Sequence, residues 1–267
     1  MTWSVRDVTV QFGDRPALSA VDLAVEPGQV HAVIGGDGAG KSTLLRVLAG
    51  LDLGQTGAIR LPAQGRIGYV PSEGGAFGDL TVDENLEFIA DAYRLSAWRP
   101  CARALLVRAA LEPFGDRLGR QLSGGQRRKL AGLLALLAQP DLLVLDEVTT
   151  GVDPVSRMEL WRLIAAAAAS GAAVVMSTTY LDEAERAEVV TLLHDGRCLA
   201  AGPPQSIVDG IPGAVFDRAA PADPARAWRR GACWRQWDPG ADPANGLAPT
   251  LEDAAIVREL LATEAST

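Results

Sequence analysis

The chain has 267 residues, 48% hydrophobic and 22% charged, which is enough for one sizeable core and a small appended domain. A formal net charge of −8 and a pI near 4.9 argue against a protein held on nucleic acid by bulk positive charge. Three scattered cysteines, Cys101, Cys198 and Cys233, lack metal-ligand spacing and are expected to be reduced thiols of a cytosolic protein. No signal peptide and no run of roughly 18 apolar residues is visible, so we expect any membrane span to come from another chain.

The first seventy residues contain five predicted strands and one helix. Residues 3–12 alternate apolar with polar side chains, which is typical of a half-buried strand. A short apolar strand is followed at once by a glycine-rich stretch and then by helical spacing, so a loop joins the strand directly to a helix. The strands are expected over residues 3–12, 18–25, 30–34, 58–61 and 66–70, and the helix over 42–49.

From residue 81 to about 138 the pattern is helical. Thr81 with Glu84 forms a capping-box sequence, and Ser123 is placed to cap a helix over 126–138. Apolar strands then alternate with helices, which indicates a parallel sheet covered on both faces. We expect strands at 142–145 and 172–178, helices at 153–170 and 181–187, and a hairpin over 188–200 that turns at Asp195-Gly196.

The composition changes after about residue 211. Six prolines lie between Pro212 and Pro249, and the segment RAWRRGACWRQW crowds tryptophans among arginines before a last predicted helix at 251–262. We favour a small β-rich appendage with tryptophan in its core. Contact with anionic lipid or nucleic acid through stacking and charge is the alternative. The predicted division is residues 1–213, with a helical part at about 80–138, and an extension over 214–267.

The glycine-rich stretch GGDGAGKST matches the pattern G-x-x-x-x-G-K-[ST]. Glycines let backbone N–H groups converge on phosphate oxygens, and the N-terminus of the next helix adds partial positive charge. Lys41 is predicted to reach the β- and γ-phosphates, and the Ser42 hydroxyl to bind Mg²⁺. The predicted phosphate-binding residues are Gly35, Gly36, Asp37, Gly38, Ala39, Gly40, Lys41, Ser42 and Thr43.

A second motif, LLVLDE, places two acidic residues after a buried strand at 142–147. Asp146 is predicted to hold the hydration shell of Mg²⁺, and Glu147 to polarise the attacking water. An apolar strand that ends in two acids is common by itself. Combined with the glycine loop, it indicates phosphoryl transfer carried by positioning and electrostatics.

The segment LSGGQ, residues 122–126, precedes a helix and provides a second anion-binding loop. One nucleotide does not need two such loops from one subunit unless subunits exchange them. With GGDGAGKST, LSGGQ and LDE in this order, residues 3–215 resemble the nucleotide-binding subunits of ABC transporters. The resemblance implies an α/β fold: a P-loop NTPase core with a mostly parallel sheet, an N-terminal antiparallel β subdomain, an inserted helical subdomain and here a small C-terminal extension.

In that family two cassettes pack head to tail, and each ATP lies between the glycine loop of one and the signature loop of the other. The resemblance implies that Ser123, Gly124, Gly125 and Gln126 face the partner's γ-phosphate, that Asp146 serves the metal and that Glu147 is the general base.

Two further roles follow from the same resemblance. Phe12 occupies the place of an aromatic ring that stacks on adenine, although a core residue at a strand end is an equal alternative. The loop Thr150–Asp153 is similar to the loop through which the two sites sense each other, and Asp153 is also a candidate helix N-cap.

Two positions depart from the family pattern. Ser72 stands where a glutamine normally touches Mg²⁺, and Thr179 where a histidine normally touches the γ-phosphate. The two histidines of the chain, His31 and His194, are interpreted as structural. Loss of one preorganised donor lowers the rate of such a site by about 10²–10³-fold. We therefore expect a cassette that binds ATP and Mg²⁺ well and hydrolyses ATP poorly, and we favour an unequal pair of cassettes over a homodimer.

The segments VDPVSRMELWRLI and TTYLDEAERAEVV, with PTLEDAAIV at 249–257, resemble cassettes of the drug and antibiotic exporter branch. The leading hypothesis is an ATPase subunit of an ABC exporter, bound to a separate membrane permease at the cytoplasmic face of the cell membrane, without nucleic acid. One alternative is a soluble ABC ATPase acting on ribosomes or DNA, which predicts twin cassettes or a basic arm. The other is a regulatory ATP-binding cassette with impaired hydrolysis.

Overall fold

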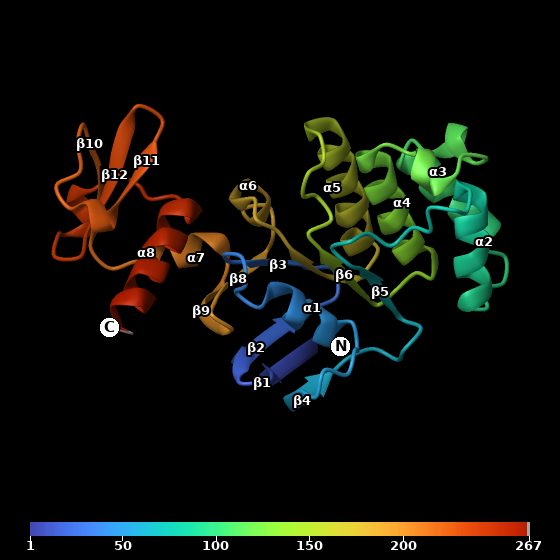
Figure 1. Cartoon of the computed structure of the whole chain (residues 1–267), viewed down its shortest axis with the longest axis horizontal. Helices are drawn as coiled ribbons and strands as arrows, with labels where there is room; N and C mark the ends of the chain where they lie inside the picture. The colour runs from blue at the N-terminus through green and yellow to red at the C-terminus, as the bar shows by residue number, and fades with distance from the viewer. Residues whose placement is uncertain (266–267) are drawn as a thin grey trace.

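A six-stranded sheet forms the centre of the chain in the computed structural model, which describes residues 1–265 (Figure 1). Its strand order is β5-β6-β7-β3-β8-β9, parallel except for the antiparallel β8–β9 hairpin. This arrangement confirms the expected mostly parallel sheet. The strands are β3 (Val30–Ile34), β5 (Ile67–Val70), β6 (Leu142–Asp146), β7 (Ala173–Ser177), β8 (Val189–His194) and β9 (Arg197–Gly202).

Helices cover both faces of this sheet, and its inner strands β3, β6 and β7 are mostly apolar and buried at every position. Alternate residues of β6 point to opposite faces: Leu142 and Val144 pack with α1 (Lys41–Leu48), whereas Leu143 and Leu145 pack with α5 (Pro154–Ala169). The sheet therefore separates two hydrophobic cores.

An antiparallel sheet of order β2-β1-β4 packs against α1 and shares its core. Its strands are β1 (Trp3–Phe12), β2 (Arg15–Val25) and β4 (Thr56–Arg60). Strand β1 ends at Phe12, close to the loop that precedes α1. The predicted N-terminal β subdomain is confirmed.

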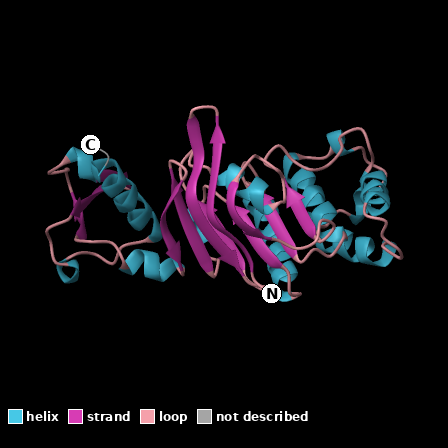
Figure 2. Cartoon of the chain, turned by 90° about the horizontal axis from the view of Figure 1, so that it is seen from below, coloured by secondary structure: helices cyan, strands magenta, loops and turns pink. Residues whose placement is uncertain are grey.

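The helical part lies at one end of the molecule (Figures 1 and 2). Its own hydrophobic core joins α2 (Val82–Ala92), α3 (Arg99–Arg108) and α4 (Gly124–Leu137). The capping box predicted for α2 is confirmed, because the Thr81 N–H donates to Glu84 Oε2 at 2.7 Å and the Glu84 N–H donates to Thr81 Oγ1 at 3.1 Å. Short 3₁₀ turns, η1 (Glu112–Phe114) and η2 (Gly119–Gln121), connect α3 to α4.

The C-terminal part lies at the other end of the molecule (Figure 1). A three-stranded antiparallel sheet of order β10-β12-β11 is followed by α8. The elements after β7 that remain are α6 (Leu181–Ala184), α7 (Pro204–Asp209), β10 (Ala214–Arg218), η3 (Pro224–Arg226), β11 (Ala227–Arg230), β12 (Cys233–Asp238), η4 (Pro243–Asn245) and α8 (Leu251–Ala265).

Trp237 of β12 is 1% exposed, and its Nε1 donates to the carbonyl of Pro212 at 2.8 Å. Trp237 is therefore a core side chain, and the division of a β-rich appendage from the rest of the chain stays a prediction. That core is continuous with the core of the central sheet, since Val215, Trp237 and Leu251 belong to the same cluster as Val174. The division at residues 213/214 stays a proposal. Within residues 1–265, no helix has the length and apolarity needed to cross a bilayer.

His31 of β3 is 3% exposed and is structural, as predicted. Its Nδ1 lies 3.1 Å from the carbonyl of Ala24, and its Nε2 lies 2.8 Å from Thr191 Oγ1. Burial lowers the pKa of His31 from 6.5 to about 4, because desolvation penalises the charged imidazolium and outweighs the hydrogen bond to Ala24.

This buried histidine predicts a pH dependence of stability. Between pH 6.5 and pH 4 His31 binds a proton in the unfolded chain but stays neutral in the folded chain. The free energy of unfolding therefore falls as the pH falls through this window. The full effect is about 3 kcal/mol. Urea unfolding at several pH values is expected to show that the free energy of unfolding depends less on pH in His31→Gln than in the natural chain. Equal slopes for the two proteins would contradict it.

Candidate functional site

The glycine loop connects the end of β3 to the start of α1. Gly40 has a φ of 101°, and a Cβ at this position would lie 2.5 Å from the carbonyl oxygen of Ala17. None of the described side chains caps α1. A helix N-terminus with uncapped amide groups is suited to an anion. A Cβ added at Gly36 or Gly38 would have no described atom within 4 Å, so this part of the loop faces open space.

Lys41 is 5% exposed and lies over this loop. Its Nζ donates to the carbonyls of Gly35 at 2.8 Å and Gly36 at 3.0 Å, and lies 3.8 Å from Glu147 Oε1. A cavity of about 300 Å³ unites residues that are far apart in the sequence. It is lined by Phe12, Ala17, Asp37, Gly38, Ala39, Gly40, Lys41, Ser42, Thr43 and Glu147.

Phe12 is 53% exposed at the rim of this cavity. The alternative interpretation of this residue as a core side chain is therefore wrong. Its aromatic ring is available for stacking beside the glycine loop (residues 35–43), which we also call the phosphate loop. Contact of the ring with adenine stays a prediction.

Asp146 is the last residue of β6 and Glu147 follows it, and Ser177 at the end of β7 forms hydrogen bonds with both. The Ser177 hydroxyl donates to Asp146 Oδ1 at 2.7 Å and accepts the Glu147 N–H at 2.9 Å. Glu147 has a φ of 48°, a conformation that costs a non-glycine residue about 1–2 kcal/mol. The hydrogen bond to Ser177 stabilises this strained backbone, which turns the Glu147 side chain toward Lys41.

Asp146 fits a role in binding Mg²⁺. The residue is fully buried, and its Oδ2 has no hydrogen-bond partner within residues 1–265, which is costly for a carboxylate oxygen unless a cation or its water ligands approach it. The described residues contain no cluster of three or more His, Cys, Asp or Glu side chains that would hold a metal alone. This donor set suits Mg²⁺, which keeps several waters and is shared between one or two carboxylates and substrate phosphates.

A second buried carboxylate, Glu183 of α6, joins two loops of the site. Its Oε2 accepts hydrogen bonds from Thr149 Oγ1 at 2.7 Å and from Thr178 Oγ1 at 2.6 Å. Thr178 Oγ1 also accepts the Tyr180 N–H at 3.0 Å, which fixes the turn that presents Thr179. Sequence reasoning missed this network and Ser177, although the run STT at 177–179 was a signal of hydroxyls beside the phosphate loop.

Thr179 is exposed and lines a second cavity of about 390 Å³, together with the loop residues Gly35, Gly36 and Asp37. Ser72 follows β5 and does not line the cavity that holds Lys41. Its backbone carbonyl accepts a hydrogen bond of 2.6 Å from Arg128.

The signature loop lies away from the phosphate loop of the same chain. Ser123 caps α4, and a capping box joins it to Gln126: the Ser123 N–H donates to Gln126 Oε1 at 2.9 Å, and the Gln126 N–H donates to Ser123 Oγ at 3.2 Å. Gly124 lines a separate cavity of about 280 Å³ beside Thr150 and Gly151, and this cavity shares no residue with the one around Lys41. Gly125 packs tightly on α5, since a Cβ there would lie 2.7 Å from Ser156 Oγ.

Asp153 is the N-cap of α5, as predicted. Its Oδ1 accepts the N–H groups of Ser156 at 3.0 Å and Val155 at 3.1 Å. The hydrogen bonds to Ser156 hold the pKa of Asp153 below its usual value. Its role in sensing the second site stays a prediction.

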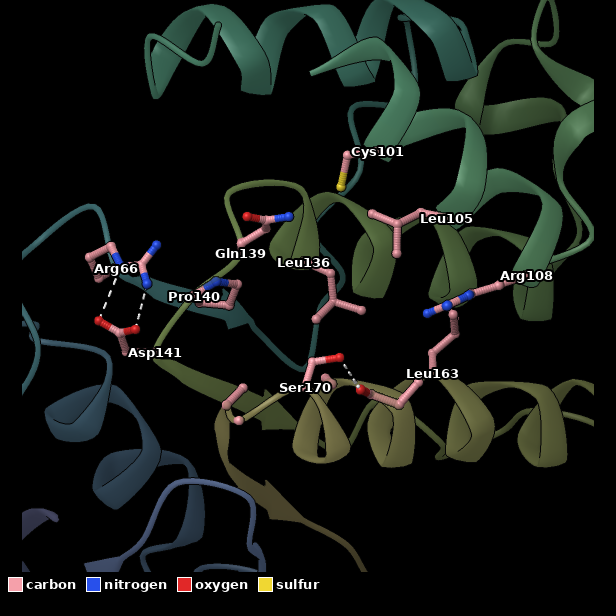
Figure 3. Close-up of a pocket in the computed structure, with 14 residues that line it drawn as sticks. Arg66, Cys101, Leu105, Arg108, Leu136, Gln139, Pro140, Asp141, Leu163 and Ser170 are labelled. Atoms are coloured by element: carbon pink, nitrogen blue, oxygen red, sulfur yellow. Dashed lines mark hydrogen bonds and ion pairs between the residues drawn. The ribbon is translucent and has the colours of Figure 1, made fainter. Parts of the chain in front are cut away.

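Another cavity, of about 400 Å³, lies away from the Lys41 cavity, between the helical part and the sheet (Figure 3). Cys101 and Leu105 of α3 lie across it from Leu163 of α5. At its edge Arg66 binds Asp141 with two hydrogen bonds of 3.0 and 2.5 Å. Arg66 and Asp141 precede β5 and β6, whereas the glycine loop follows β3. This cavity therefore lies at the N-terminal ends of the parallel strands, and the Lys41 cavity at their C-terminal ends.

Comparisons with known proteins agree with this geometry. A sequence profile of the family described as ABC transporter matches residues 18–150. The "Probable multidrug ABC transporter ATP-binding protein YbhF" of Escherichia coli K12 is 38% identical over 220 residues, which cover 78% of this chain but only 38% of that protein. The "Nod factor export ATP-binding protein I" of Cupriavidus metallidurans is 35% identical, over 77% of this chain and 72% of that protein. A solved structure titled "Structure of ATP binding subunit of ABC transporter" is 28% identical, with a TM-score of 0.72 over 78% of this chain and 92% of that one.

The Glu183 network predicts a specific pattern of stability changes. Thr149→Val and Thr178→Val each remove one donor from a buried carboxylate, so each is expected to lower the free energy of unfolding by about 1–3 kcal/mol. The matched control is Thr150→Val, because the Thr150 hydroxyl has no hydrogen-bond partner in the described chain. Urea unfolding of the three variants and of the double variant tests this. Equal effects at positions 149 and 150, or additive effects at 149 and 178, would contradict the shared network.

Proposed function

The chain belongs to the ABC transporter family, and from this premise we propose that it is the ATP-binding subunit of an exporter that drives a separate membrane permease. The observation that carries the proposal is the cavity in which the glycine loop, Lys41, Ser42 and Glu147 meet. Amide groups, an ammonium group and a hydroxyl converge there with a carboxylate, which is the set that phosphoryl transfer to water requires.

Each residue of the site has a proposed task. The glycine loop and the N-terminus of α1 bind the phosphates, and Lys41 exchanges its carbonyl partners Gly35 and Gly36 for phosphate oxygens. Ser42 and Asp146 hold Mg²⁺, which supplies positive charge against the β- and γ-phosphates. Glu147 orients the attacking water and accepts its proton.

Hydrolysis in this site is proposed to be slow. Thr179 presents a hydroxyl beside the phosphate loop, but it lacks the reach and the charge of an imidazole. Ser72 likewise replaces a longer amide side chain. Binding of MgATP depends on the loop and on Asp146, both of which are intact, so affinity is retained while the rate falls.

Two cassettes are proposed to complete each site. The signature loop of this chain lines a cavity of its own and shares no lining residue with the Lys41 cavity, so it is free to face the phosphate loop of another cassette. Because its signature loop is intact whereas positions 72 and 179 deviate, an unequal pair is favoured over a homodimer. In such a pair this chain would complete a hydrolysing site on its partner.

Export is supported by the relatives, whose names refer to multidrug transport and to Nod factor export. This chain spans about 38% of the length of the YbhF relative, so the activity, substrate and partners of the whole protein are proposals. We place the subunit at the cytoplasmic face of the cell membrane, attached through the permease. Of the alternatives, the regulatory ATP-binding cassette is favoured by Thr179 and Ser72, and separate measurements of affinity and turnover distinguish it.

Restoring the imidazole tests the explanation of slow hydrolysis. Thr179→His is expected to raise ATP turnover by up to about 10²-fold, because it returns one preorganised group to the terminal phosphate. The affinity for MgATP is expected to change less than the rate. Phosphate release under saturating ATP measures the effect, with Thr179→His/Glu147→Gln as the control that should lose it. Unchanged turnover in Thr179→His would show that position 179 does not limit the rate.

A further inference from the structure

The cavity beside Thr179 is closed on one side by α8, the last helix of the chain. Its lining combines the loop residues Gly35, Gly36 and Asp37 with four residues of α8. The α8 residues are Glu252, Ala255, Ile256 and Glu259. The C-terminal extension, for which the sequence indicated only a small appendage, therefore reaches the phosphate loop.

Helix α8 is fixed firmly in this position. Leu251, Ala254 and Val257 are at most 1% exposed and belong to the core of the central sheet. Asp253, fully buried, accepts the N–H of Thr250 at 2.8 Å. Arg258 Nη2 donates to the carbonyl of Gly210 at 3.2 Å. The helix is thus a rigid wall of the cavity.

The sheet of the extension adds to this anchoring. Arg230 of β11 and Arg235 of β12 approach the Asp253 carboxylate to 3.6 and 3.9 Å. Two of the arginines that gave the segment its basic composition thus point at α8. These two arginines therefore help to fix α8 in place.

The cavity that α8 closes is acidic at its rim and apolar inside. Glu252 and Asp37 are exposed, and Glu259 is 38% exposed, with His194 Nδ1 at 4.0 Å. Leu181, Leu192 and Ile256 contribute apolar surface to the same cavity. Three carboxylates beside a site for a polyanion repel it, unless a basic surface covers them.

The signature side of the chain has the complementary chemistry. Arg127 is exposed and lines the cavity next to Gly124, together with Arg128, which also donates to the Ser72 carbonyl, and with Glu73, whose carboxylate lies 3.8 Å from Arg46. Two apolar side chains at the start of α5 stand out into solvent, Val155 at 61% and Met158 at 43% exposed. In a head-to-tail pair, the signature side of one cassette faces the phosphate-loop side of the other.

We propose that α8 forms part of the surface on which the second cassette closes. Glu252 and Glu259 face basic side chains on the partner's signature side, and Ile256 contacts the apolar start of its α5. This inference rests on the proposed pairing of cassettes and assigns the extension a role in it. The second cassette considered is a second copy of this chain, because the basic and apolar groups described above lie on the signature side of this same chain.

Cross-linking tests the proximity. Two preparations of the chain are mixed, both with Glu147→Gln and with the three natural cysteines changed to serine. One preparation also has Glu252→Cys, and the other also has Val155→Cys. A bifunctional maleimide is expected to join the two chains in MgATP and not without it. The control replaces Glu252→Cys with Asp91→Cys, on the exposed side of α2 at the far end of the molecule. Light scattering reports pairing in the same samples.

The outcomes separate the two proposals. Pairing in MgATP without more cross-linked product than the Asp91→Cys control would overturn the role of α8 and leave the pairing intact. Binding of MgATP with no pairing of the two preparations would overturn the closure of a second copy of this chain on α8, and would leave the unequal pair of the proposed function standing.

Charge reversal tests the electrostatic part. Glu252→Lys/Glu259→Lys is expected to weaken MgATP-driven pairing by about tenfold or more, because like charges then meet across the interface. The matched control, Glu87→Lys/Asp91→Lys on α2, changes the net charge equally and is expected to leave pairing within about twofold. Equal weakening by both pairs would show an effect of net charge alone and would contradict the proposal.

Discussion

The hydrogen bond between Ser177 and Asp146 is the interaction on which the site depends. Strand β7 lies between β6, which ends in the two acids, and β3, which leads into the glycine loop. In the sheet register Ser177 is opposite both Asp146 and Val33, so β7 places its hydroxyl between the two halves of the site, where it bonds to the acidic half. By donating to one Asp146 oxygen and accepting the Glu147 N–H, it leaves the other Asp146 oxygen for a hydrated cation and holds Glu147 in its strained conformation. Thr178 continues the link through Glu183 to Thr149, so two consecutive hydroxyl residues, Ser177 and Thr178, connect β7 with Asp146 and with the loop after β6.

The parts of the fold that were predictable from sequence are those with local causes. The glycine loop between a strand and a helix, the capping boxes at Thr81 and Ser123 and the Asp153 cap each depend on residues within a few positions of one another. The partners of Ser177 and Glu183 lie 31 and 34 residues away, and only the sheet order brings them together. Phe12 shows a different limit: alternation identified its strand, but exposure at the strand end depends on what packs beyond it. Helix α7 and the contact of α8 with the phosphate loop likewise follow from tertiary packing.

The C-terminal extension has a physical connection to the nucleotide site. Its tryptophan core merges with the core of the central sheet, and its arginines point at the buried Asp253 of α8. A buried carboxylate is costly unless it is paired, so Asp253 makes the docking of α8 depend on the extension's sheet. In turn α8 presents Glu252 and Glu259 beside the phosphate loop. A segment that composition alone describes as an appendage is therefore continuous with the sheet that carries the glycine loop.

The proposed slow hydrolysis rests on the retention of the binding groups together with the altered positions 72 and 179, so affinity and turnover must be measured separately. Equilibrium binding of MgATP and single-turnover hydrolysis, measured on the same purified chain, test this most directly. We predict tight binding that disappears in Lys41→Ala, with hydrolysis at least about 10²-fold below the roughly 10 s⁻¹ that is typical of enzymes. Turnover of several ATP per second by the chain alone, abolished by Glu147→Gln, would contradict it.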